Sequence, residues 1–298
     1  MIKNIGLPFK VIKSFSQVRK IFKAFRPDAV IGVGGYSSFP VLRSAQAGNI
    51  PSFIHESNSF AGKSNKLLGR KAIKIFVAGD GMEKFFPAQK IMIVGNPVRK
   101  TISESIVSRE EGINFFGLDP AKKTILSIGG SLGANNINEA LHKHLEEFEQ
   151  NGLQLIWQTG QPFAQRANER AGGKINVWNG EFITKMEFAF AAADLVISRS
   201  GAMAIAELCV MKKPVVFVPY PFAAEDHQTV NAQSLVNKGA GIMVKDNEAL
   251  DKLVPAIIAL ATDEQRQSEL KNNIAKLAIT NADEIIAREI LATIEMRN

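Results

Sequence analysis

Residues 125 to 138, Ile-Leu-Ser-Ile-Gly-Gly-Ser-Leu-Gly-Ala-Asn-Asn-Ile-Asn, decide the fold of this 298-residue chain. An apolar, partly β-branched run ends in two glycines and meets a helix-compatible segment, which predicts a buried parallel strand turning sharply into a helix. Glycine there permits φ > 0 and close approach of a ligand, and the free N-terminus of a helix favours a phosphate. Ser131 adds a hydroxyl beside those N–H groups. A tight turn that binds nothing is an equally good interpretation of one such loop.

The rest of the chain repeats this rhythm of strand, polar or Gly-rich turn, and helix. Helices are expected between the strands, near 100–116, and over 248–261, 264–279 and 283–296. Alternation of this kind predicts an α/β protein with two doubly wound parallel sheets. The first half begins with a helix, so we expect it to lack the opening βα units of such a domain. The predicted strands are 29–33, 52–54, 73–77, 91–94, 124–128, 153–158, 175–178, 194–197, 215–218 and 241–244.

Composition is that of a globular protein large enough for two domains, with 46% hydrophobic and 22% charged residues. The single cysteine, Cys209, excludes an internal disulfide framework, and its apolar neighbours predict a place in the core. No run reaches the ~18 apolar residues that span a bilayer. Residues 1–26 do not resemble a signal peptide, because charged residues interrupt every apolar stretch in them. We therefore expect a cytoplasmic location.

The formal net charge of +7 is concentrated at the start of the chain. Residues 1–27 hold seven of the 36 Lys and Arg and no acid, and the remaining 29 bases equal the acids in number. Ser14, with Gln17 at the capping-box position, predicts an amphipathic helix over 14–26 that Pro27 ends. Such a basic, aromatic-rich segment suits either an anionic membrane surface or ordinary packing on a sheet. Without a recognition motif, we expect no nucleic-acid partner.

Two further stretches predict ligand contacts near the loop at 129–134. After a strand ending at Ser198, Gly201 permits a turn and a helix begins about Ala202, giving a second anion site. Glu207 lies within two turns of that start, where a carboxylate can bind a ribose diol or merely complement the helix dipole. A later loop would present His227 and Gln228 at the same crevice, with Asp226 as a helix cap being the simpler alternative.

No metal or other cofactor is expected. The four histidines show no ligand spacing with cysteines or carboxylates, and no Asp-x-Asp pair is present. The charge of a bound diphosphate would then be met by helix N-termini, hydroxyl groups and Arg99.

Six motifs, in this order along the chain, resemble the MurG family from about residue 5 to the C-terminus. Those enzymes transfer GlcNAc from UDP-GlcNAc to undecaprenyl-diphospho-MurNAc-pentapeptide at the cytoplasmic face of the bacterial plasma membrane. The resemblance implies the GT-B fold, the first of its two domains being incomplete here. Residues 1–98 with helix 283–298 would face acceptor and membrane, and residues 99–282 would bind the UDP-sugar. The motifs are Gly34-Gly35-Tyr36, His55-Glu56-Ser57-Asn58 with Gly62 and Asn65, Gly95-Asn96-Pro97-Val98-Arg99, Gly129 to Ala134, Arg199 to Glu207, and His227-Gln228 with Asn231-Ala232.

The same resemblance implies a role for individual residues. Glu207 would hold the ribose, Ile183 the uracil, and Gln228 with Asn58 the GlcNAc hydroxyls. Arg99 matches a further position of the donor site. The diphosphate would be met by Ser131 and by the helix start at Ala202, Met203 and Ala204.

Departures from the family concern the acceptor side. An opening strand with a Gly-Gly-x-Gly-Gly-His loop, whose histidine is a candidate general base, does not occur here, which leaves Glu56 as the candidate base of an inverting transfer. Phe39 replaces a usual glycine, so we expect a narrower site for the acceptor diphosphate. We expect weak UDP-GlcNAc binding and poor transfer. A UDP-GlcNAc 2-epimerase and a non-catalytic UDP-sugar-binding remnant are the alternative functions.

Overall fold

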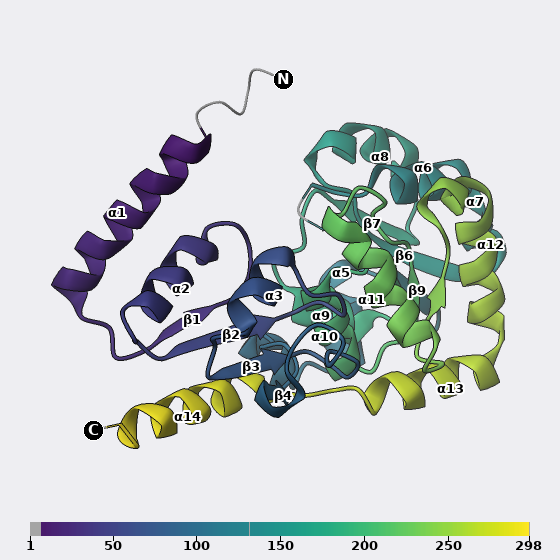
Figure 1. Ribbon diagram of the computed structural model, residues 1–298. Helices are drawn as coiled ribbons and strands as arrows, with labels where there is room; N and C mark the ends of the chain where they lie inside the picture. Colours follow the sequence, from purple (N-terminus) through teal and green to yellow (C-terminus); the bar gives the residue numbers. More distant parts are fainter. Residues whose placement is uncertain (1–6, 131, 298) are drawn as a thin grey trace. The chain divides into compact units, whose positions relative to one another are not determined.

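A computed structural model describes residues 7–130 and 132–297. The chain divides into two compact units, which Figure 1 shows in sequence colours. Unit 1 combines Met1–Pro97 with Asn281–Asn298, and unit 2 is Val98–Thr280. Among the described residues, no helix is both long enough and apolar enough to cross a bilayer.

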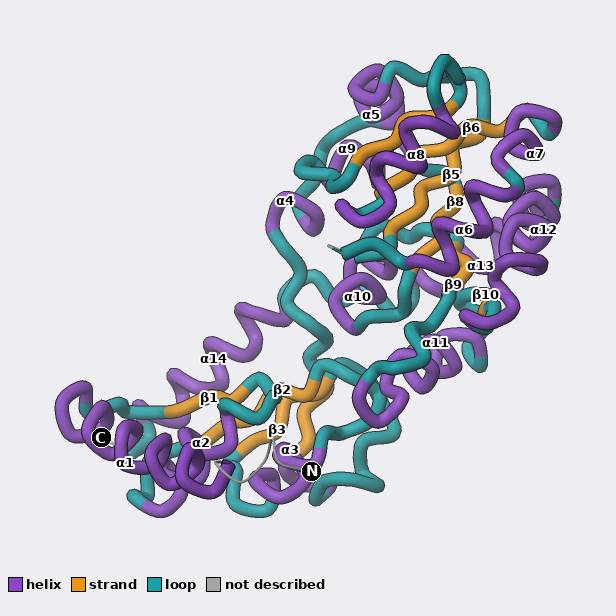
Figure 2. The backbone as a smooth tube through the Cα atoms, turned by 90° about the horizontal axis from the view of Figure 1, so that it is seen from above, coloured by secondary structure: helices purple, strands orange, loops and turns teal. Residues whose placement is uncertain are grey.

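Unit 1 is a four-stranded parallel sheet flanked by helices (Figure 2). Its strands follow one another in chain order, β1-β2-β3-β4. The elements are α1 (Leu7–Phe25), β1 (Val30–Gly32), α2 (Ser38–Ala47), β2 (Ser52–Glu56), α3 (Lys63–Gly69), β3 (Lys74–Val77), the 3-10 helix η2 (Ala88–Lys90), β4 (Ile91–Ile93) and α14 (Ala282–Glu295).

Successive side chains of each strand point to opposite faces of this sheet, and helices cover both faces. Ile54 and Ile75 point to one face, where they pack with Leu42 of α2. Phe53 and Phe76 stack on the other face, where Ile286 of α14 joins them. An ion pair between Lys74 and Glu289 also ties α14 to this sheet. The C-terminal segment is therefore part of the core of unit 1.

Unit 2 is a six-stranded parallel sheet with the strand order β10-β9-β8-β5-β6-β7. Successive strands are added on one side of β5 up to β7, and the chain then crosses back to place β8 on the other side. The strands are β5 (Lys123–Ile128), β6 (Leu153–Gln158), β7 (Val177–Gly180), β8 (Leu195–Ser198), β9 (Val215–Phe217) and β10 (Ile242–Met243). The helices are α4 (Lys100–Ser103), α5 (Arg109–Phe116), α6 (Asn135–Lys143), α7 (Leu145–Gln150), η3 (Gln161–Phe163), α8 (Ala164–Ala171), α9 (Met186–Ala192), α10 (Ala202–Val210), η4 (Ala224–Asp226), α11 (His227–Val236), η5 (Asp246–Glu248), α12 (Ala249–Thr262) and α13 (Glu264–Ala275).

This order makes the carboxyl ends of β5 and β8 the place where the direction of strand addition reverses. Ligands of doubly wound sheets bind in the crevice at such a reversal. The expectation of two parallel α/β sheets is confirmed. Cys209 is buried in the core of unit 2 as predicted, and burial raises the pKa of its thiol to about 12.

Several predicted elements differ in their limits; helix α13, for example, ends at Ala275 and not at residue 279. Helix α1 begins at Leu7 and not at Ser14, whose Oγ donates to the Val11 carbonyl 2.6 Å away. Extending a helix costs less than starting one, and Pro8 lies in the first turn, where proline is tolerated. The connecting helix is split into α4 and α5, because Ser108 and Glu111 form a capping box that starts a new helix. Strand β7 lies two residues later than predicted.

Candidate functional site

The Gly-rich loop follows β5 directly, and α6 begins after it at Asn135. Gly130 and Gly133 take φ of +84° and +75°, the left-handed region that favours glycine. A Cβ on Gly133 would collide with the carbonyl oxygen of Thr159, so this loop lies directly against the end of β6. Ser131, predicted to meet a diphosphate, lies outside the described residues.

The second predicted anion site is formed by the start of α10, which Gly201 precedes as N-cap. Its strand β8 pairs with β5, so the two strand-to-helix turns emerge side by side. Ser200 fixes this turn, since its Oγ donates to the Gln228 carbonyl (2.8 Å) and its own carbonyl accepts from Asn231 Nδ2 (3.2 Å). Of the helix start, Ala204 lines the cavity described below, whereas Met203 is exposed and outside its lining.

Glu207 forms a two-point ion pair with Arg99. The Nε and Nη2 atoms of Arg99 lie 2.9 and 2.8 Å from Glu207 Oε1. The Glu207 side chain is 12% exposed, so this carboxylate is largely shielded from water. Both residues line the same cavity, although 108 positions separate them in the chain.

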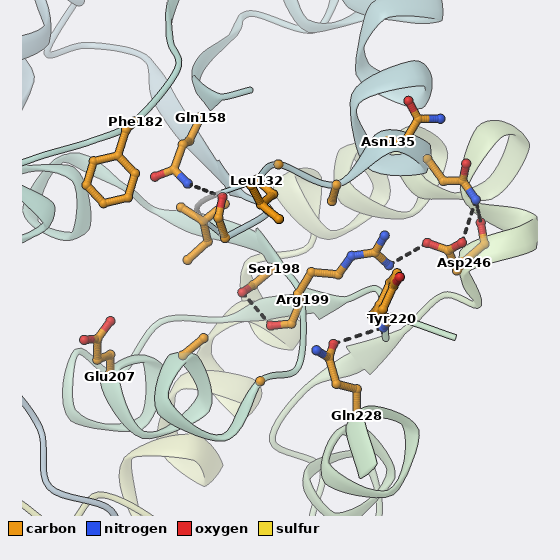
Figure 3. Close-up of a pocket in the computed structure, with 18 of the residues that line it drawn as sticks. Leu132, Asn135, Gln158, Phe182, Ser198, Arg199, Glu207, Tyr220, Gln228 and Asp246 are labelled. Atoms are coloured by element: carbon orange, nitrogen blue, oxygen red, sulfur yellow. Dashed lines mark hydrogen bonds and ion pairs between the residues drawn. The ribbon is translucent and has the colours of Figure 1, made fainter. Parts of the chain in front are cut away.

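The loop before α11 brings Gln228 to the cavity but not His227. Gln228 Oε1 accepts from the Tyr220 N–H (3.0 Å), which leaves its Nε2 toward the open space in Figure 3. His227 Nδ1 instead lies 2.6 Å from the Ala224 carbonyl. Asp226 makes no side-chain cap to α11 and accepts from the Thr229 hydroxyl at 2.7 Å. The expected pairing of His227 with Gln228 in one crevice is therefore wrong.

Ile183 is buried, and its N–H donates to Gln158 Oε1 at 3.3 Å. The neighbouring Phe182 is 55% exposed and lines the cavity. The segment assigned to uracil therefore contributes the Phe182 ring and the Ile183 N–H. This N–H already donates to Gln158.

Sequence reasoning missed an ion pair in the wall of the cavity. Arg199 Nη1 donates to Asp246 Oδ1 (2.5 Å) and to the carbonyls of Val218 and Pro219 (2.9 and 3.0 Å), as Figure 3 shows for the side-chain partner. Asn136 Nδ2 donates to the other oxygen of Asp246 at 2.6 Å. Arg199 opens one of the motifs named from the sequence, whereas nothing in the sequence distinguishes its partner Asp246.

Together these groups surround a cavity of about 710 Å³ in unit 2, a size suited to a small-molecule ligand (Figure 3). It opens at the strand reversal between β5 and β8. The described residues hold no cluster of three or more His, Cys, Asp or Glu side chains able to bind a metal ion. The lining residues are Arg99, Ile128, Gly129, Gly130, Leu132, Gly133, Ala134, Asn135, Asn136, Gln158, Phe182, Met186, Ser198, Arg199, Gly201, Ala204, Glu207, Tyr220, Phe222, Gln228 and Asp246.

In unit 1, Glu56 organises the loop that carries Asn58. The Asn58 N–H and Nδ2 donate to Glu56 Oε1 (3.2 and 3.3 Å), and Gly62 N–H and Asn65 Nδ2 donate to Oε2 (3.1 and 2.8 Å). Glu56 is 4% exposed, and both of its oxygens accept from donors of the following loop and, through Asn65, of helix α3. Phe39, expected to narrow an acceptor site, is partly buried against the core that contains Leu42.

The sequence matches both domains of one enzyme family. The model of the glycosyltransferase family 28 C-terminal domain matches residues 124–288, and that of the N-terminal domain matches residues 1–77. Curated relatives are UDP-N-acetylglucosamine--N-acetylmuramyl-(pentapeptide) pyrophosphoryl-undecaprenol N-acetylglucosamine transferases. That of Parabacteroides distasonis is 46% identical over 100% of this chain and 81% of its own length. That of Bacteroides thetaiotaomicron is 47% identical over 99% and 81%.

Solved structures are similar over the same extent. The crystal structure of Acinetobacter baumannii MurG has a TM-score of 0.78 and 30% identity, covering 96% of this chain and 79% of that one. A UDP-GlcNAc 2-epimerase from Neisseria meningitidis, bound to UDP-GlcNAc, has a TM-score of 0.68 at 16% identity, covering 98% and 84%. The second likeness shows a common fold alone.

Proposed function

Because the chain belongs to glycosyltransferase family 28 and, within it, to the MurG family, we propose that the cavity of unit 2 binds UDP-GlcNAc. The protein is an N-acetylglucosaminyltransferase of peptidoglycan synthesis that moves GlcNAc from this donor to undecaprenyl-diphospho-MurNAc-pentapeptide. The observation that carries this function is 46% identity to a curated transferase over the whole chain.

Within the donor site, the diphosphate would lie between the 129–134 loop, including Ser131, and the start of α10 at Ala202, Met203 and Ala204. Backbone N–H groups at both turns favour an anion there. Uracil would pair with the Ile183 N–H beside Phe182. The free Nε2 of Gln228 would donate to a GlcNAc hydroxyl. Asn58, on unit 1, is a second proposed ligand for sugar hydroxyls.

Glu207 would accept hydrogen bonds from the ribose hydroxyls. Its present partner, Arg99, keeps the shielded carboxylate neutralised, since an unpaired buried charge is costly. Arg99 is 55% exposed and long enough to turn its free edge to a phosphate while remaining beside Glu207. We propose that this pair links ribose recognition to charge compensation at the diphosphate.

Transfer would proceed as an inverting displacement independent of a metal ion. The acceptor hydroxyl attacks the anomeric carbon, its proton goes to a base, and UDP leaves with the electron pair of the broken bond. Helix N-termini and arginine side chains aimed at the diphosphate would stabilise its growing charge. Because both oxygens of Glu56 serve the loop that carries Asn58, we propose that Glu56 orders this loop and does not act as the base.

The acceptor carries a lipid, so we propose that unit 1 lies on the anionic cytoplasmic face of the bacterial plasma membrane as a peripheral protein. Helix α1 supports this proposal. Phe15, Val18 and Phe22 are turned inward, while Ile12 and Phe25 are 67% and 76% exposed. Lys10, Lys13, Lys20 and Lys23 of the same helix are exposed as well. Apolar groups among lysines are the chemistry of an interfacial helix.

The reaction is tested with purified protein, UDP-GlcNAc labelled in the sugar, and undecaprenyl-diphospho-MurNAc-pentapeptide in detergent. We expect label to appear in the lipid product, with UDP released in equal amount and only when both substrates are present. Incubation with UDP-GlcNAc alone is the control, because an epimerase would convert it to UDP-ManNAc. Conversion without acceptor, or tight donor binding with no transfer, would refute the proposal.

A further inference from the structure

Gln158 connects two parts of the cavity that the sequence does not place together. It is the last residue of β6 and is 4% exposed. Its Nε2 donates to the Gly130 carbonyl at 2.9 Å, and its Oε1 accepts from the Ile183 N–H at 3.3 Å. This orientation of the amide is fixed chemically, because the reverse would set oxygen against oxygen and N–H against N–H.

The Gly130 carbonyl is itself central to the Gly-rich loop. It also accepts from the Gly133 N–H at 3.0 Å, so the Gln158 amide holds the turn at its closing hydrogen bond. On the other side, the N–H groups of Thr159 and Gly160 donate to the carbonyls of Gly180 and Glu181 (2.9 and 3.0 Å). Backbone hydrogen bonds thus connect the end of β6 to the segment that leads to Ile183. The side chain of Gln158 connects the same end to the Gly-rich loop.

We propose that Gln158 is a positioning residue for nucleotide binding. Its Nε2 holds the Gly-rich loop through the hydrogen bond to Gly130. Its Oε1 accepts the hydrogen bond of the Ile183 N–H until a bound pyrimidine accepts that bond instead. The Ile183 bond lies beyond the usual 2.7–3.2 Å range of N–H···O bonds and is weaker than the bond to Gly130. Base binding therefore displaces the weaker bond and keeps the stronger one. This inference rests on the proposed donor site.

Two opposite effects on ligand binding follow. A side chain without hydrogen-bonding groups releases the Ile183 N–H, so a ligand with a base alone should bind as well as before or better. The same change loosens the loop, so a ligand with a diphosphate should bind less well. A general structural defect would weaken both ligands.

The test is calorimetric titration of the full chain with uridine and with UDP. For Gln158→Met we expect the Kd of UDP to rise about tenfold, as for the loss of one hydrogen bond, while that of uridine stays equal or falls. Gln154→Met is the matched control. Gln154 lies on the same strand, is buried, and bonds Asp119 and Thr124 at the opposite end from the cavity. It should leave both constants unchanged.

Gln158→Glu provides a second variant should the first fold poorly. Its carboxylate keeps an acceptor for the Ile183 N–H, now charge-assisted, but repels the Gly130 carbonyl. Both ligands should bind less well, so weaker binding of uridine is expected for Gln158→Glu and not for Gln158→Met. A parallel change of both ligands in Gln158→Met, or none, would overturn the inference. A wild-type chain that binds no UDP would instead refute the proposed function, and the inference with it.

Discussion

At the scale of single residues, the cavity is held by side chains that already satisfy one another. Glu207 is paired with Arg99, and Asp246 with Arg199 and Asn136. Each carboxylate is therefore compensated and fixed in direction before any ligand arrives. Pre-oriented polar groups lose less entropy on binding than mobile ones, so this pairing prepares the site for a charged, hydroxyl-rich ligand.

Replacing Glu207 tests its proposed role toward the ribose. Glu207→Gln keeps the size but removes the charge that accepts hydroxyl hydrogen bonds. We expect KM for UDP-GlcNAc to rise about 10- to 100-fold, the worth of one or two charge-assisted hydrogen bonds, with a smaller change in kcat. Initial rates at varied donor concentration measure this. Glu110→Gln, on an exposed residue in the first turn of α5, is the control and should change neither constant. An unchanged KM in Glu207→Gln would exclude the ribose role.

Lys213 predicts a pH dependence of stability outside the site. Burial lowers the pKa of its ammonium to about 8 from 10.5, although its Nζ donates to the Ala193 carbonyl at 2.6 Å. Between these two values the unfolded chain binds more protons than the folded one, so this residue's contribution to stability rises with pH. Relative to Lys213→Met, the unfolding free energy of the wild type should increase by roughly 2 kcal/mol from pH 7.5 to 10. Urea unfolding of both proteins checks this, and a constant difference would contradict it.

At the scale of elements, the apolar residues of α1 fall into two groups, one packed inward and one exposed. Phe15 and Phe22 line the side toward α2, and Val18 is buried. Ile12, Ile21 and Phe25 remain exposed among lysines. The sequence indicated an amphipathic basic helix, and the structure distinguishes the apolar residues that hold the helix in place from those left for a partner.

Vesicle binding tests this division of α1. The wild type should co-sediment with vesicles containing phosphatidylglycerol, and less so at high salt, because lysines contribute through screened electrostatics. Ile12→Glu with Phe25→Glu should reduce the bound fraction at least fivefold, since apolar burial is lost and repulsion is added. Ile106→Glu changes an isoleucine of unit 2 that is 96% exposed and should bind as the wild type does. Equal binding by all three proteins would exclude α1 as the membrane contact.

At the scale of the whole molecule, the two sheets differ in the feature that creates a ligand crevice. The sheet of unit 1 runs in chain order, while that of unit 2 reverses between β5 and β8. Where the strand order reverses, the connections that leave two neighbouring strands pass to opposite faces of the sheet. A crevice then opens between the N-termini of the two helices that follow these strands. We therefore expect the UDP part of the donor to bind unit 2 by itself.

Hydrogen exchange in the presence of UDP tests that expectation. At 100 times Kd, a ligand of the native state adds about 2.7 kcal/mol to its stability. Protection should increase in unit 2, most of all at 129–134, 181–183 and 199–207. Amides of β2 and β3 in unit 1 should exchange as they do without ligand and serve as the internal control. Equal protection of both sheets would show that UDP is not bound by unit 2 alone.

The sequence by itself determined the order of elements and the turns that carry the site. Apolar runs marked the strands, because burial constrains contiguous residues, and glycines at 129–130 and 201 marked the two turns. Of these glycines Gly130 takes a positive φ, whereas Gly201 is an extended N-cap with φ of −64°. Local patterns also have limits: Ser14 offered a cap that a longer helix made unnecessary, and no pattern favoured Asp246.

Only the tertiary structure decided which side chains meet. Arg99 reaches Glu207, Gln158 joins Gly130 to Ile183, and Asp246 receives Arg199, each across 25 to 108 positions of chain. These pairings depend on strand order, since β5 lies between β6 and β8 only after the sheet has assembled. Periodicity records which face of an element is buried but carries no information about its neighbour. Packing therefore decides which side chains meet in the walls of the cavity. The sequence decides which turns along the chain carry the cavity.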